Sequence, residues 1–287
     1  MARPVDTALA ILNGALGDWL SATGNGLATE MSFAGERPAS LGRRAVVLVH
    51  GLMCTEDVFR LDDGTDYGKR LERDLGFSPL YVRYNSGRAI GESGQDLARL
   101  LDRLVSDNPD LEEILLLGFS MGGLVIRSAC HHGVLAEHAW TARVKRCIYA
   151  GTPHLGSPWE RAGRTLTRVA RLIPDPYARL VADLGDLRSR GIKDLGDPCH
   201  PYPLLESIDH FLVAGWIDER LAELFGDAMV PLASGTNGAC VDSRALPPEH
   251  VRIVPRIAHL DLARSEEVYD HVRAFVERGE RKKEETC

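Results

Sequence analysis

Short apolar runs recur along the chain and alternate with stretches of helical period. Most of these runs are continuous rather than alternating, which is typical of strands covered on both faces of a parallel sheet. The expected strands are residues 45–49, 80–83, 114–117, 147–150, 211–214 and 251–254. The expected helices are residues 66–75, 95–105, 122–135 and 262–275. This repeated order of strand and helix predicts an α/β protein with a mostly parallel sheet flanked by helices.

Two regions do not follow the alternation. Near the N-terminus, apolar side chains form one helical stripe of Val5, Ala8, Leu9, Leu12, Leu16 and Trp19. We therefore expect residues 1–40 to be an amphipathic segment packed on the core, with a membrane-surface or partner-binding helix as the alternative. Residues 159–197 are rich in Arg and Leu and interrupted by Pro and Gly. They predict a small helical insertion within a single domain of residues 41–287. The last residues of this domain, 277–287, are expected to form a charged, solvated tail.

Composition narrows the possible functions. The formal charge of −7 provides no general attraction to nucleic acid or to anionic lipid. No stretch approaches the ~20 apolar residues of a membrane-spanning helix, and we expect neither a transmembrane segment nor a secretory signal. The six cysteines lack C-x-x-C spacing, so free thiols and a cytoplasmic location are expected, while a Cys199–Cys240 bridge stays open.

A G-x-S-x-G motif lies between an expected strand and an expected helix. It spans residues 118–122 and places Ser120 at the turn. A serine at such a tight turn needs a strained backbone, and the flanking glycines avoid collisions that larger side chains would cause. The helix that follows directs its first N–H groups and its positive dipole end at the same place. Ser120 is therefore the candidate nucleophile.

A serine nucleophile needs a histidine that removes its proton. In an open parallel sheet this histidine should follow a late strand, because reactive groups gather beyond the carboxyl ends of the strands. His259 meets this condition, since it follows the strand at 251–254 and precedes the last helix. His154 also follows a strand and is its competitor, whereas His250 and His271 are expected at the surface.

A carboxylate must in turn orient the histidine. Asp227 follows the strand at 211–214 and precedes His259 by 32 residues; Asp218 is the second choice. The chain order Ser120, Asp227, His259 is the order of the α/β-hydrolases and differs from that of the serine proteases.

Two backbone donors are needed for the negative charge that develops on the substrate oxygen. One is expected at Met121, the residue after the nucleophile. The second should follow an earlier strand, where Gly51 allows close approach and the N–H of Leu52 is the candidate. His50 is expected to brace this loop rather than to act as a base.

Taken together, these segments resemble the α/β-hydrolase superfamily, and within it the branch of bacterial lipases and esterases similar to GPI inositol-deacylase. The likeness rests on five segments in the same order, residues 50–52, 118–123, 151–157, 226–231 and 259–265. It implies an eight-stranded, mostly parallel sheet, the triad of Ser120, Asp227 and His259, the donors Leu52 and Met121, and hydrolysis of carboxylic esters. One position departs from the family, whose aspartate is usually followed by glycine where this chain has Ala228.

The resulting hypothesis is a serine esterase or lipase that cleaves a small-molecule or lipid ester through an acyl-enzyme. Some lipases of this branch bind calcium, but no calcium-site residue can be matched here, so neither a metal nor a cofactor is expected. The insertion at 159–197 is expected to cap the acyl pocket. An acyltransferase or thioesterase would share all five segments; a peptidase and a non-catalytic scaffold are further alternatives. The oligomeric state is left open.

Overall fold

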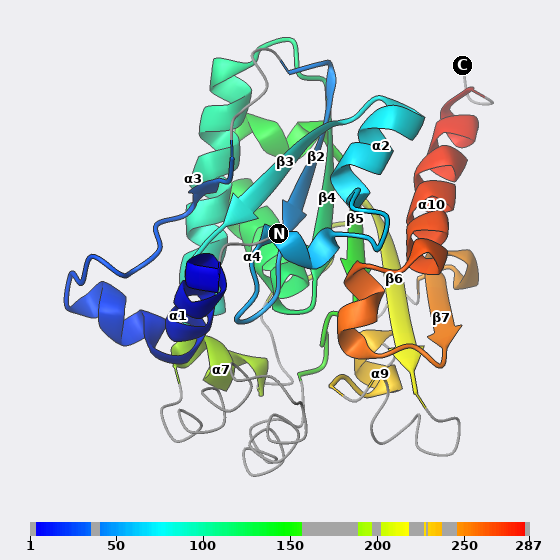
Figure 1. Cartoon of the computed structure of the whole chain (residues 1–287). Helices are drawn as coiled ribbons and strands as arrows, with labels where there is room; N and C mark the ends of the chain where they lie inside the picture. Colours follow the sequence, from blue (N-terminus) through cyan, green and yellow to red (C-terminus); the bar gives the residue numbers. More distant parts are fainter. Residues whose placement is uncertain are drawn as a thin grey trace.

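A computed structural model describes residues 4–35, 41–156, 189–196, 202–217, 227, 229–236 and 246–284. Their centre is a twisted sheet covered by helices on both faces (Figure 1). Its seven strands are β1 (Ser32–Phe33), β2 (Arg44–Val49), β3 (Ser78–Arg83), β4 (Glu113–Phe119), β5 (Val144–Ala150), β6 (Asp209–Trp216) and β7 (Val251–Pro255). They lie in the order β1-β3-β2-β4-β5-β6-β7, and all neighbours are parallel except β1 and β3.

All six expected strands are confirmed, and each is longer than expected, by one residue in β2 and β7 and by two to four residues in β3 to β6. The sequence pattern missed β1, because a strand of two residues has no period to detect. The resemblance implies eight strands, whereas the described residues contain seven.

The α-helices are α1 (Pro4–Ala22), α2 (Tyr67–Leu75), α3 (Ile90–Asp107), α4 (Met121–Leu135), α7 (Arg190–Leu195), α9 (Leu232–Gly235) and α10 (Glu266–Glu284). Short 3-10 helices are η1 (Glu56–Phe59), η2 (Ala139–Arg143), η5 (Pro248–His250) and η6 (His259–Ala263). The helix α3 begins at Ile90, five residues earlier than expected. The helix α10 begins at Glu266 rather than at residue 262, and it continues to Glu284 across the region expected to be a solvated tail. No helix in the described part of the chain is both long and apolar enough to span a bilayer.

The two faces of the sheet bury separate apolar cores. Alternate residues of each strand point to opposite faces, so Val47 and Leu116 pack with α3 and α4, while Val46 and Leu117 pack with α2 and α10. The helix pairs on opposite sides of the sheet are visible in Figure 1. Burial on both faces explains why the strands are continuous apolar runs rather than alternating ones.

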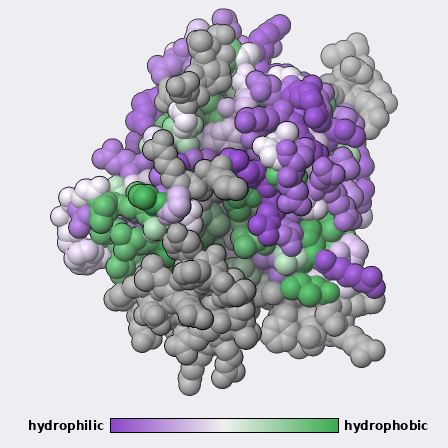
Figure 2. Space-filling model, viewed as in Figure 1, coloured by the Kyte–Doolittle hydropathy of each residue, from purple (hydrophilic) through white to green (hydrophobic). Residues whose placement is uncertain are grey.

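The N-terminal helix packs through a different face from the expected one. None of the stripe residues Val5, Ala8, Leu9, Leu12, Leu16 and Trp19 is buried, and Trp19 is 56% exposed. Instead α1 buries Ile11, Asn13, Gly14, Ala15, Gly17 and Leu20. Figure 2 shows apolar side chains gathered on the surface over α1. The helix was therefore predicted correctly, but its contact face was wrong.

Several expectations concern residues outside the described ranges. They include most of the insertion at 159–197, of which residues 189–196 are described, and both cysteines of the possible Cys199–Cys240 bridge. The described cysteines Cys54, Cys130 and Cys147 are free thiols.

Candidate active site

Ser120 lies at the junction of β4 and α4 in a strained conformation. Its φ of 53° and ψ of −124° are unusual for a residue with a side chain. The Ser120 N–H donates to the carbonyl of Ala150 at the end of β5, at 2.8 Å. The turn thus lifts Ser120 to the carboxyl ends of the central strands, where an open parallel sheet has its reactive crevice.

The two glycines of the motif are required by close backbone contacts. A Cβ at Gly118 would lie 2.6 Å from the Gly123 backbone, and a Cβ at Gly122 would lie 2.2 Å from the carbonyl oxygen of Val49. Real Cβ atoms do not approach other atoms this closely. The sharp turn at Ser120 therefore depends on glycine at both positions.

Asp227 and His259 form a buried pair. The His259 Nδ1 and Asp227 Oδ2 atoms are 2.8 Å apart, and their side chains are only 5% and 2% exposed. The other carboxylate oxygen, Oδ1, accepts from the N–H groups of Met229 at 3.0 Å and Val230 at 2.8 Å. The His259 N–H also donates to the Asp227 carbonyl at 3.0 Å. Side chain and backbone contacts together hold the imidazole in one orientation.

This contact determines the tautomer of His259. A carboxylate oxygen accepts hydrogen bonds, so Nδ1 carries the proton and the neutral ring keeps its lone pair on Nε2. The ring lies 5.0 Å from that of Phe119, the neighbour of Ser120. Its Cε1 atom would be 3.0 Å from a Cβ at Gly151. Gly151 directly follows Ala150, whose carbonyl accepts from the Ser120 N–H. His259 and Ser120 therefore border the same end of β5.

The competing histidine has a different partner. His154 is fully buried, and its Nδ1 lies 3.0 Å from Nη1 of Arg127. A guanidinium only donates, so Nδ1 is the acceptor and the proton of the neutral ring sits on Nε2. The lone pair on Nδ1 is thus engaged and Nε2 carries the proton, so His154 offers no lone pair to a serine hydroxyl.

The loop after β2 is held against Ser120. A Cβ at Gly51 would be 3.0 Å from the Ser120 Cβ. The Gly51 carbonyl accepts from the Cys54 N–H at 3.3 Å and lies 2.9 Å from His50 Nδ1, which must therefore donate. Because N–H and C=O point in opposite directions across a trans peptide, fixing this carbonyl also fixes the N–H of Leu52.

Met121 is the first residue of α4 and is fully buried. The first four N–H groups of a helix have no intrahelical acceptor, so the Met121 N–H is available to an anion beside Ser120. The two predicted donors therefore lie on segments that both adjoin Ser120.

Burial lowers the pKa of His50 to about 4, while its ring stacks on Tyr84 with centroids 4.5 Å apart. In the unfolded chain the pKa is near 6.5, so the neutral ring stabilises the fold above that pH and the stabilisation is lost as the pH falls toward 4. When the pH is lowered from about 7 to about 5, the wild type should lose more free energy of unfolding than His50→Gln. We expect this difference to be about 2 kcal/mol. Urea unfolding at both pH values measures this difference, and equal losses in the two proteins would contradict it.

Other sequence expectations for this region have mixed outcomes. His250, expected at the surface, is buried and its Nδ1 contacts the His210 carbonyl at 3.1 Å. Asp218 and Ala228 lie outside the described residues. Sequence reasoning missed Ser86, whose Oγ accepts from the Met53 N–H at 3.0 Å. Its place just beyond β3, at the same edge as the other site residues, was the available signal.

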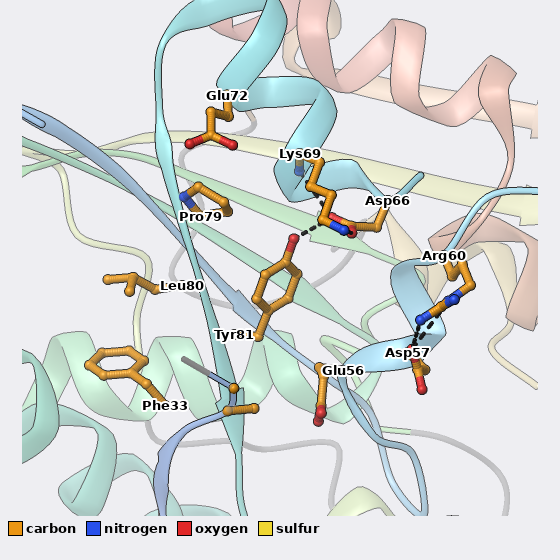
Figure 3. Close-up of a pocket in the computed structure, with 12 residues that line it drawn as sticks. Phe33, Glu56, Asp57, Arg60, Asp66, Lys69, Glu72, Pro79, Leu80 and Tyr81 are labelled. Carbon is orange, nitrogen blue, oxygen red and sulfur yellow. Dashed lines mark hydrogen bonds and ion pairs between the residues drawn. The ribbon is translucent and has the colours of Figure 1, made fainter. Parts of the chain in front are cut away.

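A separate cavity of about 450 Å³ lies beside β3, α2 and η1 (Figure 3). Its charges are largely matched within the protein, because Asp57 pairs with Arg60 at 2.6 Å and Asp66 contacts both Lys69 and the Tyr81 hydroxyl. Neither Ser120 nor His259 lines it. Among the described residues, no three His, Cys, Asp or Glu side chains gather in a way that could hold a metal ion.

No family model matches this chain, and no curated protein matches it in sequence. Solved structures of similar shape are found. The mature lipase BlEst2 of Bacillus licheniformis is 17% identical, with 86% of this chain and 97% of that one covered and a TM-score of 0.55. The esterase PF2001 of Pyrococcus furiosus is also 17% identical, with 83% and 82% covered and a TM-score of 0.54. The type II thioesterase YbtT of a yersiniabactin pathway is 16% identical, with 88% and 97% covered and a TM-score of 0.51.

These similarities cover most of the chain, since 83% to 88% of its residues align with each of the three structures. At such low identity they concern the architecture of the chain rather than its chemistry. The chain has the fold of the α/β-hydrolase superfamily.

Proposed function

We propose that the protein is a serine hydrolase of carboxylic esters, with Ser120 as nucleophile, His259 as general base and Asp227 as the residue that orients His259. The observation that carries the proposal is the buried Asp227–His259 contact of 2.8 Å beside the strained turn at Ser120. A carboxylate, an imidazole in a defined tautomer and a hydroxyl on a tight turn are the groups that acyl transfer to serine requires.

In the first step the Ser120 Oγ attacks the ester carbonyl carbon while His259 Nε2 takes the hydroxyl proton. The carbonyl oxygen becomes an anion, which the N–H groups of Leu52 and Met121 stabilise. His259 then gives its proton to the departing alkoxide, the C–O bond to the alcohol breaks, and an acyl-Ser120 ester remains. The charge that forms on the imidazole is stabilised by Asp227.

In the second step a water molecule replaces the alcohol. His259 Nε2 takes a proton from this water as its oxygen attacks the acyl carbon, and the same two N–H groups bind the second oxyanion. The intermediate collapses, Ser120 recovers the proton from His259, and the carboxylic acid is released. Protons and electron pairs balance in both the acylation and the deacylation step without a cofactor.

We propose an apolar acyl ester, from a small molecule or a lipid, as the substrate. The shared fold with a lipase and an esterase supports this class. A thioester substrate is the second candidate, because YbtT, a thioesterase, has the same fold. An acyltransferase would differ only in the acceptor that reaches the acyl-enzyme.

A chain-length series of p-nitrophenyl esters from acetate to laurate, together with matched acyl thioesters, tests the substrate class. We expect kcat/KM to be higher for the oxygen esters and to rise with chain length to a maximum set by the acyl pocket. Turnover of thioesters alone would support the second candidate. Product transfer to an added alcohol in preference to water would indicate an acyltransferase.

Rapid mixing with a p-nitrophenyl ester should give a burst of p-nitrophenol before the steady rate is reached. The burst is expected because acylation releases the phenol while the acyl group still blocks Ser120. Its amplitude should approach one equivalent per enzyme when deacylation is the slower step. A good substrate that is hydrolysed without an acyl-enzyme, as shown by mass spectrometry of the quenched reaction, would contradict the two-step route.

We also propose that the protein works in a reducing compartment such as the cytoplasm. Cys130 and Cys147 support this proposal, because both are buried free thiols in one apolar core. Thiol titration of the denatured protein, purified without reductant from the cytoplasm, should detect both.

A further inference from the structure

The N-terminal helix contacts the crevice edge of the sheet through glycine rather than through its apolar stripe. Glycine lowers the stability of a helix relative to alanine, so two buried glycines in the interior of α1 need a reason in packing. The reason lies in the segments that α1 covers. These are the loop after β2 and the loop after β3.

Gly14 faces Met53, the residue after the proposed oxyanion donor Leu52. A Cβ at Gly14 would lie 2.3 Å from the Met53 Cγ and 3.1 Å from the Met53 backbone nitrogen. Met53 has a φ of 58°, which places it in the left-handed region. The Cys54 N–H donates to the Gly51 carbonyl and closes a turn of residues 51–54. Met53 is the third residue of this turn, which is the position where a type II turn needs a positive φ. The helix α1 therefore contacts this turn directly, at the residue with the positive φ.

Gly17 faces the second loop. A Cβ there would lie 1.7 Å from Oδ1 of Asn85, and the Asn85 Nδ2 donates to the Gly17 carbonyl at 2.8 Å. Gly87 on the same loop approaches α1 so closely that a Cβ would lie 2.1 Å from the Asn13 carbonyl oxygen. The two loops are joined to each other by the bond from the Met53 N–H to Ser86.

The segment that follows the insertion closes the same junction. Ser189 Oγ, at the N-cap of α7, donates to the Gly14 carbonyl at 2.7 Å. The Arg190 N–H donates to Asp18 of α1 at 3.0 Å, and the Gly191 N–H donates to the Gly87 carbonyl at 3.0 Å. The helix α1 is thus tied to three separate segments near the crevice.

We infer that α1 is a positioning element for the oxyanion site and that Met53 is the positioning residue through which it acts. The inference rests on the proposed function, since it concerns the N–H of Leu52. Gly14 brings the α1 backbone against Met53, and this contact together with Ser86 maintains the positive φ of the turn. The turn in turn aims the Leu52 N–H at the oxygen of a bound ester. A small displacement of a donor is costly, because stabilisation of the transition state depends on its distance.

The test is Gly14→Ala, alone and together with Met53→Ala, with Gly26→Ala as the matched control. A Cβ at Gly26 meets nothing within 4 Å, so this variant measures the effect of a glycine replacement without a clash. We expect Gly14→Ala to lower kcat for a p-nitrophenyl ester by about 10- to 100-fold with little change in KM. Removal of the Met53 Cγ in the double variant takes away the closest clash and should restore part of the lost kcat. Gly26→Ala should keep the wild-type kcat.

Hydrogen exchange provides a readout that does not need activity. In Gly14→Ala the amides of residues 51–54 should exchange faster than in the wild type, while those of α10 should not change. Two results would overturn the inference. One is a Gly14→Ala protein whose amides at residues 51–54 exchange at the wild-type rate, and the other is a loss of kcat that the double variant does not relieve. If the wild type hydrolyses no ester or thioester but the exchange result is obtained, the proposed function fails while the contact between α1 and this loop stands.

Discussion

Replacing Ser120 by alanine should lower kcat/KM for a p-nitrophenyl ester by about 10⁴- to 10⁶-fold. The variant lacks the oxygen that forms the acyl-enzyme, and the burst of p-nitrophenol should disappear with it. The remaining rate should be that of an ester held near the Leu52 and Met121 donors and attacked by water. Steady-state kinetics at a high enzyme concentration, with the ester still in excess, can measure this residual rate.

The melting temperature of Ser120→Ala should change little, because alanine keeps the Cβ and loses only the hydroxyl. Ser128→Ala is the matched control. Ser128 lies further along α4, and its buried Oγ has no hydrogen-bond partner among the described residues. We expect this control to keep wild-type turnover. A Ser120→Ala enzyme with wild-type turnover would remove Ser120 from the mechanism.

Replacing His259 by alanine should cost about as much, roughly 10⁴- to 10⁶-fold in kcat/KM, because triad members act as a unit. Without the imidazole, no group takes the proton from Ser120 in either half of the reaction. The buried Asp227 carboxylate also loses the Nδ1–H of His259 and keeps its two backbone donors, Met229 and Val230. A modest loss of thermal stability is therefore expected as well.

His154→Gln separates the two candidate bases. Glutamine can accept from Arg127 with its side-chain oxygen, so the variant preserves the contact that His154 makes. We expect it to keep turnover within about tenfold of the wild type, since no proton passes through His154. A folded His154→Gln enzyme without activity, beside an active His259→Ala enzyme, would reverse the assignment of the base.

Most of the sheet was predictable because both of its faces are buried. A parallel strand covered on both sides must be apolar at nearly every position, so the runs at residues 45–49 and 114–117 mark β2 and β4 directly. The turn at Ser120 was predictable for a similar reason. Close backbone contacts at Gly118 and Gly122 leave no alternative to glycine, and the G-x-S-x-G pattern records this constraint.

The packing of α1 was not predictable from its hydrophobic pattern. Its apolar stripe indicated one contact face, but the helix approaches the loops after β2 and β3 through Gly14 and Gly17. Hydrophobic periodicity detects the burial of large side chains. It does not detect contacts that the backbone makes at a glycine. The glycines were visible in the sequence, yet their role depends on Met53 and Asn85, which are distant along the chain.

The choice between His154 and His259 also required the fold. Both residues follow a strand, and the sequence places both near the carboxyl edge of the sheet. Only the hydrogen-bond partners distinguish them, since Arg127 engages the Nδ1 lone pair of His154 while Asp227 leaves that of His259 on Nε2. Such partners come from segments that no local pattern connects.

The central claim is that Asp227 and His259 activate the hydroxyl of Ser120. Treatment with a fluorophosphonate, followed by peptide mass spectrometry, tests it most directly. We predict a single adduct on Ser120 in the wild type and labelling slowed by about 10³- to 10⁴-fold in Asp227→Asn, whose amide favours the wrong tautomer of the imidazole. An adduct on any other residue, or unchanged labelling of Ser120 in Asp227→Asn, would contradict the account.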